Sequence, residues 1–161
     1  MAPGFLTLHH PGTSVSVTLV ADSSGDVAQL NDLVEIVGEN SSHTEVSLVE
    51  NDGAGVAALE TLPDEYDETT DYSAGEVIGE ATVLLRHPID WLVPTDGDWV
   101  PSTTETESPA AGDLTVSESG GSVRGYDTAG GDTGDMVLGP VWTTLNRGAQ
   151  TDGKIAVARQ R

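Results

Sequence analysis

Several residue types and patterns are scarce or absent in this chain of 161 residues. It has no cysteine, so neither a disulfide nor a thiolate metal site stabilises the fold. Lys154 is the only lysine. No apolar run approaches the roughly 20 residues that a membrane-spanning helix needs, so the sequence predicts no membrane partner. The N-terminus lacks the basic region and apolar stretch of a signal peptide, so we expect synthesis in the cytoplasm, and release by assembly or lysis if the protein ends up outside the cell.

Catalytic signatures are also missing. The sequence contains no G-x-S-x-G elbow, no P-loop and no dinucleotide-binding fingerprint, and it has only four histidines. These absences predict a protein that is not an enzyme and needs no cofactor. A Ser-His-Asp triad assembled in space stays open as an alternative, because such sites are defined by geometry and not by spacing.

The residues that offer metal ligands are poorly arranged. His9 and His10 are adjacent, and neighbouring side chains of an extended strand point to opposite faces, so the pair is not placed to chelate. The acidic loops 96–98 and 127–135 offer oxygen ligands for Ca²⁺ or Na⁺. Their glycine and aspartate spacing departs from that of calcium-binding repeats, and we interpret them as turns with solvated carboxylates. No metal site is predicted.

The charge balance is strongly acidic. Aspartate and glutamate number 27 against six lysines and arginines, which gives a formal net charge of −21. At molar salt the Debye length shrinks to about 3 Å and most of the self-repulsion disappears, so this composition indicates adaptation to concentrated salt. An acidic disordered protein is the alternative, which the apolar strand patterns and three tryptophans disfavour. The lack of a basic stripe argues against nucleic acid as a partner.

Charge is distributed unevenly along the chain. Residues 1–21 contain no aspartate, glutamate, lysine or arginine. Within them, Val15, Val17 and Leu19 alternate with serine and threonine as in a half-buried strand, whereas residues 1–14 hold prolines and glycines and are predicted to form an extended arm. Residues 141–161 carry a local balance of +3. This stretch is either a strand with a few surface cations or a basic patch that faces an acidic neighbour.

Short apolar runs separated by turn residues predict a mainly β protein. The expected strands are 15–19, 33–37, 44–49, 55–59, 76–85, 89–93, 114–116, 122–126, 136–145 and 154–158. For Leu33–Val37 a short helix capped by Asp26 and closed by Gly38 is the alternative. We therefore predict a single mainly β domain over residues 15–161, with the extended arm and long acidic loops such as 63–71.

An ordered series of short motifs runs from Tyr72 to the C-terminus: Ala74–Gly79, Leu85–Pro94, Ala111–Leu114, Gly120–Val123, Val137–Val141 and Gly153–Val157. This series resembles the small head-decoration and capsid-stabilising proteins of tailed viruses, and Asn31–Val34 and Gly55–Ala57 are similar to earlier strands of that family. The resemblance covers about two thirds of the chain. It implies a small β-barrel or β-tulip, no catalysis, homotrimers on a capsid exterior and an arm that orders on docking.

The resemblance also assigns roles to residues of this chain. The expected partner is the major capsid protein of a haloarchaeal tailed virus. The residues expected to dock on the capsid are Phe5, Leu6, Leu8, His9 and His10. Those expected at subunit or shell interfaces are Trp91, Trp142, Arg147, Lys154, Arg159 and Arg161. Two alternatives are another virion surface component, such as a turret, spike base or tail protein, and a glycan-binding module in which tryptophans stack on sugars.

Overall fold

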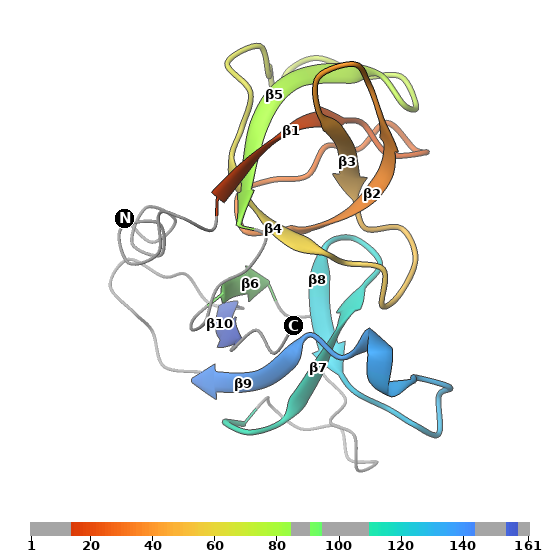
Figure 1. Cartoon of the computed structure of the whole chain (residues 1–161), viewed down its shortest axis with the longest axis vertical. Helices are drawn as coiled ribbons and strands as arrows, with labels where there is room; N and C mark the ends of the chain where they lie inside the picture. Colours follow the sequence, from red (N-terminus) through yellow and green to blue (C-terminus); the bar gives the residue numbers. More distant parts are fainter. Residues whose placement is uncertain (1–13, 85–90, 95–109, 144–153, 158–161) are drawn as a thin grey trace.

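The computed structural model describes residues 14–84, 91–94, 110–143 and 154–157. Within these ranges the regular structure is β-strand apart from one short 3-10 helix, which confirms the predicted mainly β class. The strands, labelled in Figure 1, are β1 (Ser14–Val20), β2 (Leu33–Glu39), β3 (Thr44–Leu48), β4 (Ala57–Thr61), β5 (Val77–Leu84), β6 (Trp91–Pro94), β7 (Leu114–Glu118), β8 (Ser122–Gly125), β9 (Gly139–Thr143) and β10 (Lys154–Val157). A 3-10 helix, η2 (Gly134–Met136), lies between β8 and β9.

The first five strands close into a small barrel in the order β1-β3-β2-β4-β5, which confirms the predicted barrel. Strand β1 closes it, because it pairs antiparallel with β5 from Ser14 to Val20 and parallel with β3 at Thr18 and Leu19. Closure leaves no free strand edge on the barrel, so its backbone groups are satisfied within the sheet. The barrel forms the upper lobe in Figure 1.

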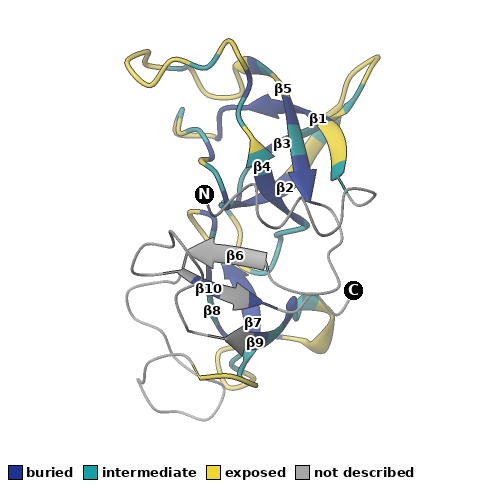
Figure 2. Ribbon diagram, turned by 90° about the vertical axis from the view of Figure 1, so that its left-hand side faces the viewer, coloured by how far each residue is buried: buried dark blue, intermediate teal, exposed yellow. Residues whose placement is uncertain are grey.

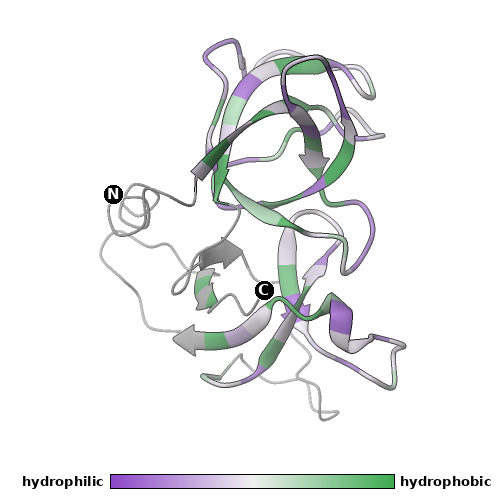
Figure 3. Cartoon of the chain, viewed as in Figure 1, coloured by the Kyte–Doolittle hydropathy of each residue, from purple (hydrophilic) through white to green (hydrophobic). Residues whose placement is uncertain are grey.

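Alternating residues of the barrel strands fill its interior. Val17, Leu19, Val46, Leu59 and Val83 are almost completely buried and belong to one apolar cluster. Figure 3 shows the hydrophobic residues gathered on these strands. Each fully buried valine or leucine side chain contributes roughly 1.5–3 kcal/mol, so this interior is the main source of stability for the first half of the chain.

The remaining strands form a second, open sheet in the order β6-β10-β9-β7-β8. Its β7–β8 hairpin was predicted from Gly120-Gly121, and both glycines have a positive φ in the turn. Strand β9 begins only at Gly139, so the prediction of a strand from Met136 was wrong at that end. Met136 lies in η2 instead, where Thr133 precedes the helix and its carbonyl oxygen accepts a hydrogen bond from the Met136 N–H.

The two sheets share a second apolar cluster. On the barrel strands, side chains that point outward alternate with those of the interior, and these outward residues pack on the second sheet. Figure 2 shows the dark blue, buried strand segments of both lobes. The cluster consists of Leu33, Val49, Ala58, Leu84, Val123, Leu138, Val141, Ile155 and Val157.

The tip of the β7–β8 hairpin docks on the barrel through backbone hydrogen bonds. The Leu33 N–H donates to the Gly121 carbonyl at 2.7 Å, and the Gly120 N–H donates to the Val49 carbonyl at 2.7 Å. The Gly55 N–H donates to Ser117 Oγ at 2.8 Å. A Cβ at Gly121 would collide with Leu48 and Asp32, so only glycine permits this approach.

Residues 22–32, which precede β2, form turns, so the alternative of a helix capped by Asp26 is not realised. Asp22 takes the capping role in a tight turn: its Oδ1 accepts hydrogen bonds from the N–H groups of Ser24 and Asp26 at 2.8 and 2.9 Å. Leu33 and Val34 instead pair with β4, because the strand buries both side chains completely.

Candidate functional site

Most of the predicted site residues lie outside the described part of the chain. These are Phe5, Leu6, Leu8, His9, His10, Arg147, Arg159 and Arg161, together with Trp99. For Trp91, Trp142 and Lys154 the structure describes the backbone alone. Their strands β6, β9 and β10 are neighbours, since β10 pairs with both of the others. The fold therefore brings these three positions to one part of the second sheet.

Sequence reasoning missed a group of exposed aliphatic residues on the barrel. Val15 in β1 is 39% exposed, and Ile36 and Val37 in β2 are 57% and 52% exposed. The two strands flank β3. The pairing register of β2 with β3 shifts between Ile36 and Gly38, which turns an adjacent apolar pair outward. The sequence indicated an apolar strand or a short helix over 33–37, and a bulge leaves no recognisable signal in such a run.

An ionic cluster lies where the barrel meets the second sheet. The Arg124 guanidinium on β8 makes a bidentate pair with Asp132, with N–O distances of 2.6 and 2.8 Å. Its Nε lies 2.6 Å from Glu118 Oε2, and its Nη2 lies 3.7 Å from Asp52 Oδ2. Asp52 belongs to the loop between β3 and β4, so a single cation links three carboxylates from both halves of the chain.

Asp132 corrects one prediction. The loop 127–135 was expected to hold solvated carboxylates, but only 4% of the Asp132 side chain is exposed. The hydrogen bonds from Arg124 lower the pKa of this carboxyl below its ordinary value, and the Asp127 N–H adds a further hydrogen bond at 2.7 Å. Both Asp132 oxygens thus accept from Arg124, and the cluster joins the loop 127–135 to the β7–β8 hairpin as a structural element.

Potential metal ligands in the described ranges do not form a cluster. Among those residues no group of three or more histidine, aspartate or glutamate side chains is arranged to hold a metal ion. His43 is the only histidine among them, and its backbone N–H donates a hydrogen bond to Asn40 Oδ1 at 2.9 Å in a turn. No helix in the described ranges is long and apolar enough to cross a membrane.

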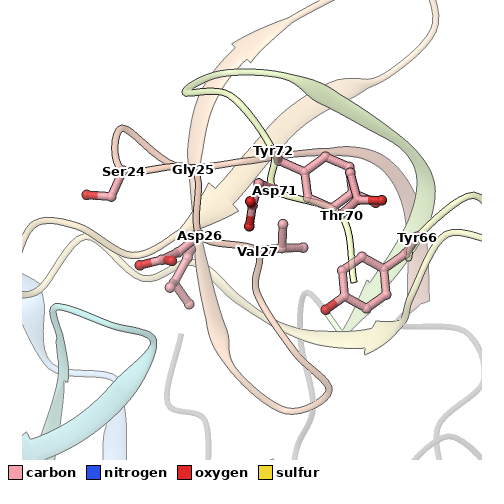
Figure 4. Close-up of a pocket in the computed structure, with 9 residues that line it drawn as sticks. Ser24, Gly25, Asp26, Val27, Tyr66, Thr70, Asp71 and Tyr72 are labelled. Atoms are coloured by element: carbon pink, nitrogen blue, oxygen red, sulfur yellow. The ribbon is translucent and has the colours of Figure 1, made fainter. Parts of the chain in front are cut away.

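A cavity of about 640 Å³ opens between two long loops of the barrel. One loop connects β1 to β2 and the other connects β4 to β5. Figure 4 shows the residues around it. Its lining consists of Ser24, Gly25, Asp26, Val27, Leu48, Tyr66, Thr70, Asp71 and Tyr72. The sequence predicted residues 63–71 only as a solvated acidic loop, and Tyr66 was the one apolar signal within it.

The two tyrosines form the aromatic part of this cavity. Their ring centroids lie 6.1 Å apart and the ring planes differ by 17°. Both side chains pack against the barrel interior. The Tyr66 hydroxyl accepts a hydrogen bond from Gln29 Nε2 at 3.0 Å, and the Tyr72 hydroxyl accepts one from the Asp67 N–H at 2.9 Å. These bonds hold both rings in place.

Comparison of the chain with protein-family models, with curated proteins and with solved structures finds no match.

Proposed function

We propose that this chain is a structural virion protein that binds the outer surface of a capsid, stabilises it and is adapted to concentrated salt. One observation carries the proposal. The uncharged residues 1–13 lead directly into β1, whose second residue, Val15, is exposed together with Ile36 and Val37 of β2. An uncharged segment thus leads into the barrel, and the barrel strands β1 and β2, on either side of β3, carry exposed aliphatic side chains on an otherwise acidic protein.

The absence of charge has a physical reason under this proposal. A segment that lies beneath another protein cannot keep unpaired carboxylates without a large desolvation cost. Phe5, Leu6 and Leu8 contribute roughly 1.5–3 kcal/mol each if fully buried. Ordering the backbone of the segment costs about 1–2 kcal/mol per residue, so additional contacts are needed. Val15, Ile36 and Val37 supply them on the barrel, and a strand edge of the major capsid protein can pair with the arm.

The rest of the surface suits an outward position in concentrated salt. Residues 14–84 contain 16 aspartates and glutamates and no lysine or arginine. At molar salt the repulsion among these carboxylates is screened within about 3 Å. We propose homotrimers whose contacts involve Trp91, Trp142 and Lys154, because the strands that carry them lie side by side. Arg147, Arg159 and Arg161 belong to the same basic C-terminal stretch.

Binding to undecorated capsids in molar salt tests the proposal. We expect the full chain to saturate the shell at a high copy number. Deletion of residues 2–13 should abolish binding while the circular dichroism spectrum persists. The double variant Ile36→Ser/Val37→Ser should bind about tenfold more weakly, since each half-exposed side chain offers about 0.7 kcal/mol of further burial.

Val77→Ser is the matched control, because Val77 is 59% exposed but lies at the start of β5. Its binding should equal that of the wild type. Wild-type affinity of the truncated chain for capsids would refute the proposal. Binding at only a few sites per particle would instead favour a vertex or tail component.

A further inference from the structure

The cavity between the two barrel loops plays no part in the proposed capsid binding. Its two walls are locked together before any ligand arrives. The Ala21 N–H donates to the Glu76 carbonyl at 2.9 Å, and the Gly75 N–H donates to the Ala21 carbonyl at 3.1 Å. Gly25 lies against the Tyr72 carbonyl so closely that a Cβ would collide with it. The cavity is therefore preorganised and loses little entropy on binding.

The two charged side chains that line this cavity are both acidic. Asp26 stands on the first loop and Asp71 on the second, and both are exposed. Within the part of the chain that the structure describes, neither carboxylate has a hydrogen-bond or ion-pair partner. Figure 4 shows Asp71 next to the ring of Tyr72, and Asp26 next to Val27. The acidic barrel adds to the negative potential, which selects against anionic ligands.

Aromatic rings beside carboxylates favour one kind of ligand. A cation with an apolar or planar body gains from the ring quadrupole of Tyr66 and Tyr72 and from the charge of Asp26 and Asp71. Sodium and potassium ions compete poorly for such a site because they hold their water. Screening at molar salt weakens the attraction between the carboxylates and a cation but leaves its contact with the aromatic rings. The tyrosines therefore contribute a larger share of the affinity at molar salt.

We propose that this cavity binds an organic cation, namely a guanidinium or alkylammonium group, with Tyr66 and Tyr72 as its π surface and Asp26 and Asp71 as its counter-charges. The inference goes beyond the proposed virion role and does not rest on it. The same chemistry has two sources: a free small molecule, or an arginine or lysine side chain of a second protein copy, such as those of the basic residues 154–161.

Titration of the full chain in molar potassium chloride, followed by the NMR signals of Tyr66 and Tyr72, tests the site. The probes are N-acetyl-arginine amide, tetramethylammonium, N-acetyl-citrulline amide and methyl glucoside. Citrulline has the shape of arginine without its charge. We expect saturable binding of the two cations and none of the two neutral probes. Equal binding of the citrulline probe, or binding of the glucoside alone, would overturn the proposal.

Variants locate the binding. Asp26→Asn/Asp71→Asn should weaken arginine amide about tenfold, and Tyr66→Leu by a similar factor. Asp64→Asn/Glu68→Gln is the control, since it removes the same amount of charge from exposed positions of the loop between β4 and β5. Neither of these residues lines the cavity. Unchanged affinity in both test variants would also overturn it.

A peptide of residues 154–161 separates the two sources of the cation. Markedly tighter binding than arginine amide assigns the site to a side chain of another copy. Equal affinity assigns it to a free small molecule. Either result supports a cation site, whereas failure of capsid binding in the earlier test would leave it unaffected.

Discussion

The barrel and the second sheet both bury an apolar core, but the charges of their residues differ greatly. Residues 14–84 hold 16 acidic residues and no lysine or arginine, whereas residues 85–161 hold 11 acidic residues and all six cations. Residues 14–84 hold no cation of their own, so the barrel opposes self-repulsion through its apolar interior, its closed backbone ladder and its contacts with the second sheet. The second sheet adds Arg124, which pairs with acids of both halves. We therefore expect the barrel to depend on screening by salt, whereas Arg124 neutralises part of the acidic charge around the second sheet.

Removal of salt should have the largest effect and should reach the barrel first. In millimolar salt the screening distance grows to about 30 Å or more, so repulsion acts across the whole barrel. We expect loss of near-ultraviolet dichroism below about 0.3 M salt. Hydrogen exchange should rise in residues 14–84 before tryptophan emission changes, because all three tryptophans lie in residues 85–161. Spectra that stay unchanged in dilute buffer would refute the salt dependence.

Leu19→Ala should have the next largest effect and should act through burial alone. Leu19 is fully buried in the barrel interior, so the truncation leaves a cavity and lowers the free energy of unfolding by about 2–5 kcal/mol. The loss should be the same at 1 M and 4 M salt in urea denaturation. Val77→Ala, at an exposed barrel position, is the control and should change stability by less than about 0.5 kcal/mol.

Arg124→Met should cost about 1–3 kcal/mol, because it leaves the nearly buried carboxylate of Asp132 without its cation. The charge cluster, and not packing, is the cause. The double variant Arg124→Met/Asp132→Asn should therefore recover part of the loss. A double variant that is less stable than Arg124→Met in the same denaturation experiment would contradict this assignment.

Acid should produce the smallest effect, best measured as the stability difference between the wild type and Arg124→Met. The folded-state pKa of Asp132 lies below the ordinary value of 3.8, chiefly because Arg124 donates to it. Its contribution is thus present above pH 3.8 and is lost as the pH falls through the folded-state pKa. The difference should be constant above pH 5 and shrink below 3.8. A difference that grows in acid would reverse the assigned sign.

Local signals predicted most of the strands correctly. Val15 to Leu19 and Thr44 to Val49 alternate between polar and apolar residues, and the Gly120-Gly121 pair marked the β7–β8 turn. These patterns are local because side chains of a strand alternate between faces and a tight turn needs glycine. Predictions for the arm and for the cationic C-terminal side chains lie outside the described residues and stay predictions.

Composition and periodicity by themselves determined that this chain is acidic, lacks disulfides and is built of short strands. The first two properties follow from residue counts, and the third follows from the alternation of neighbouring residues. Only the tertiary structure decided the parallel pairing of β1 with β3 and the ion pair of Arg124 with Asp52. It also decided that Asp26, Tyr66 and Asp71 line the same cavity. Those contacts join residues far apart in sequence. Their geometry follows from how the barrel closes and how the hairpin docks, which no local pattern encodes.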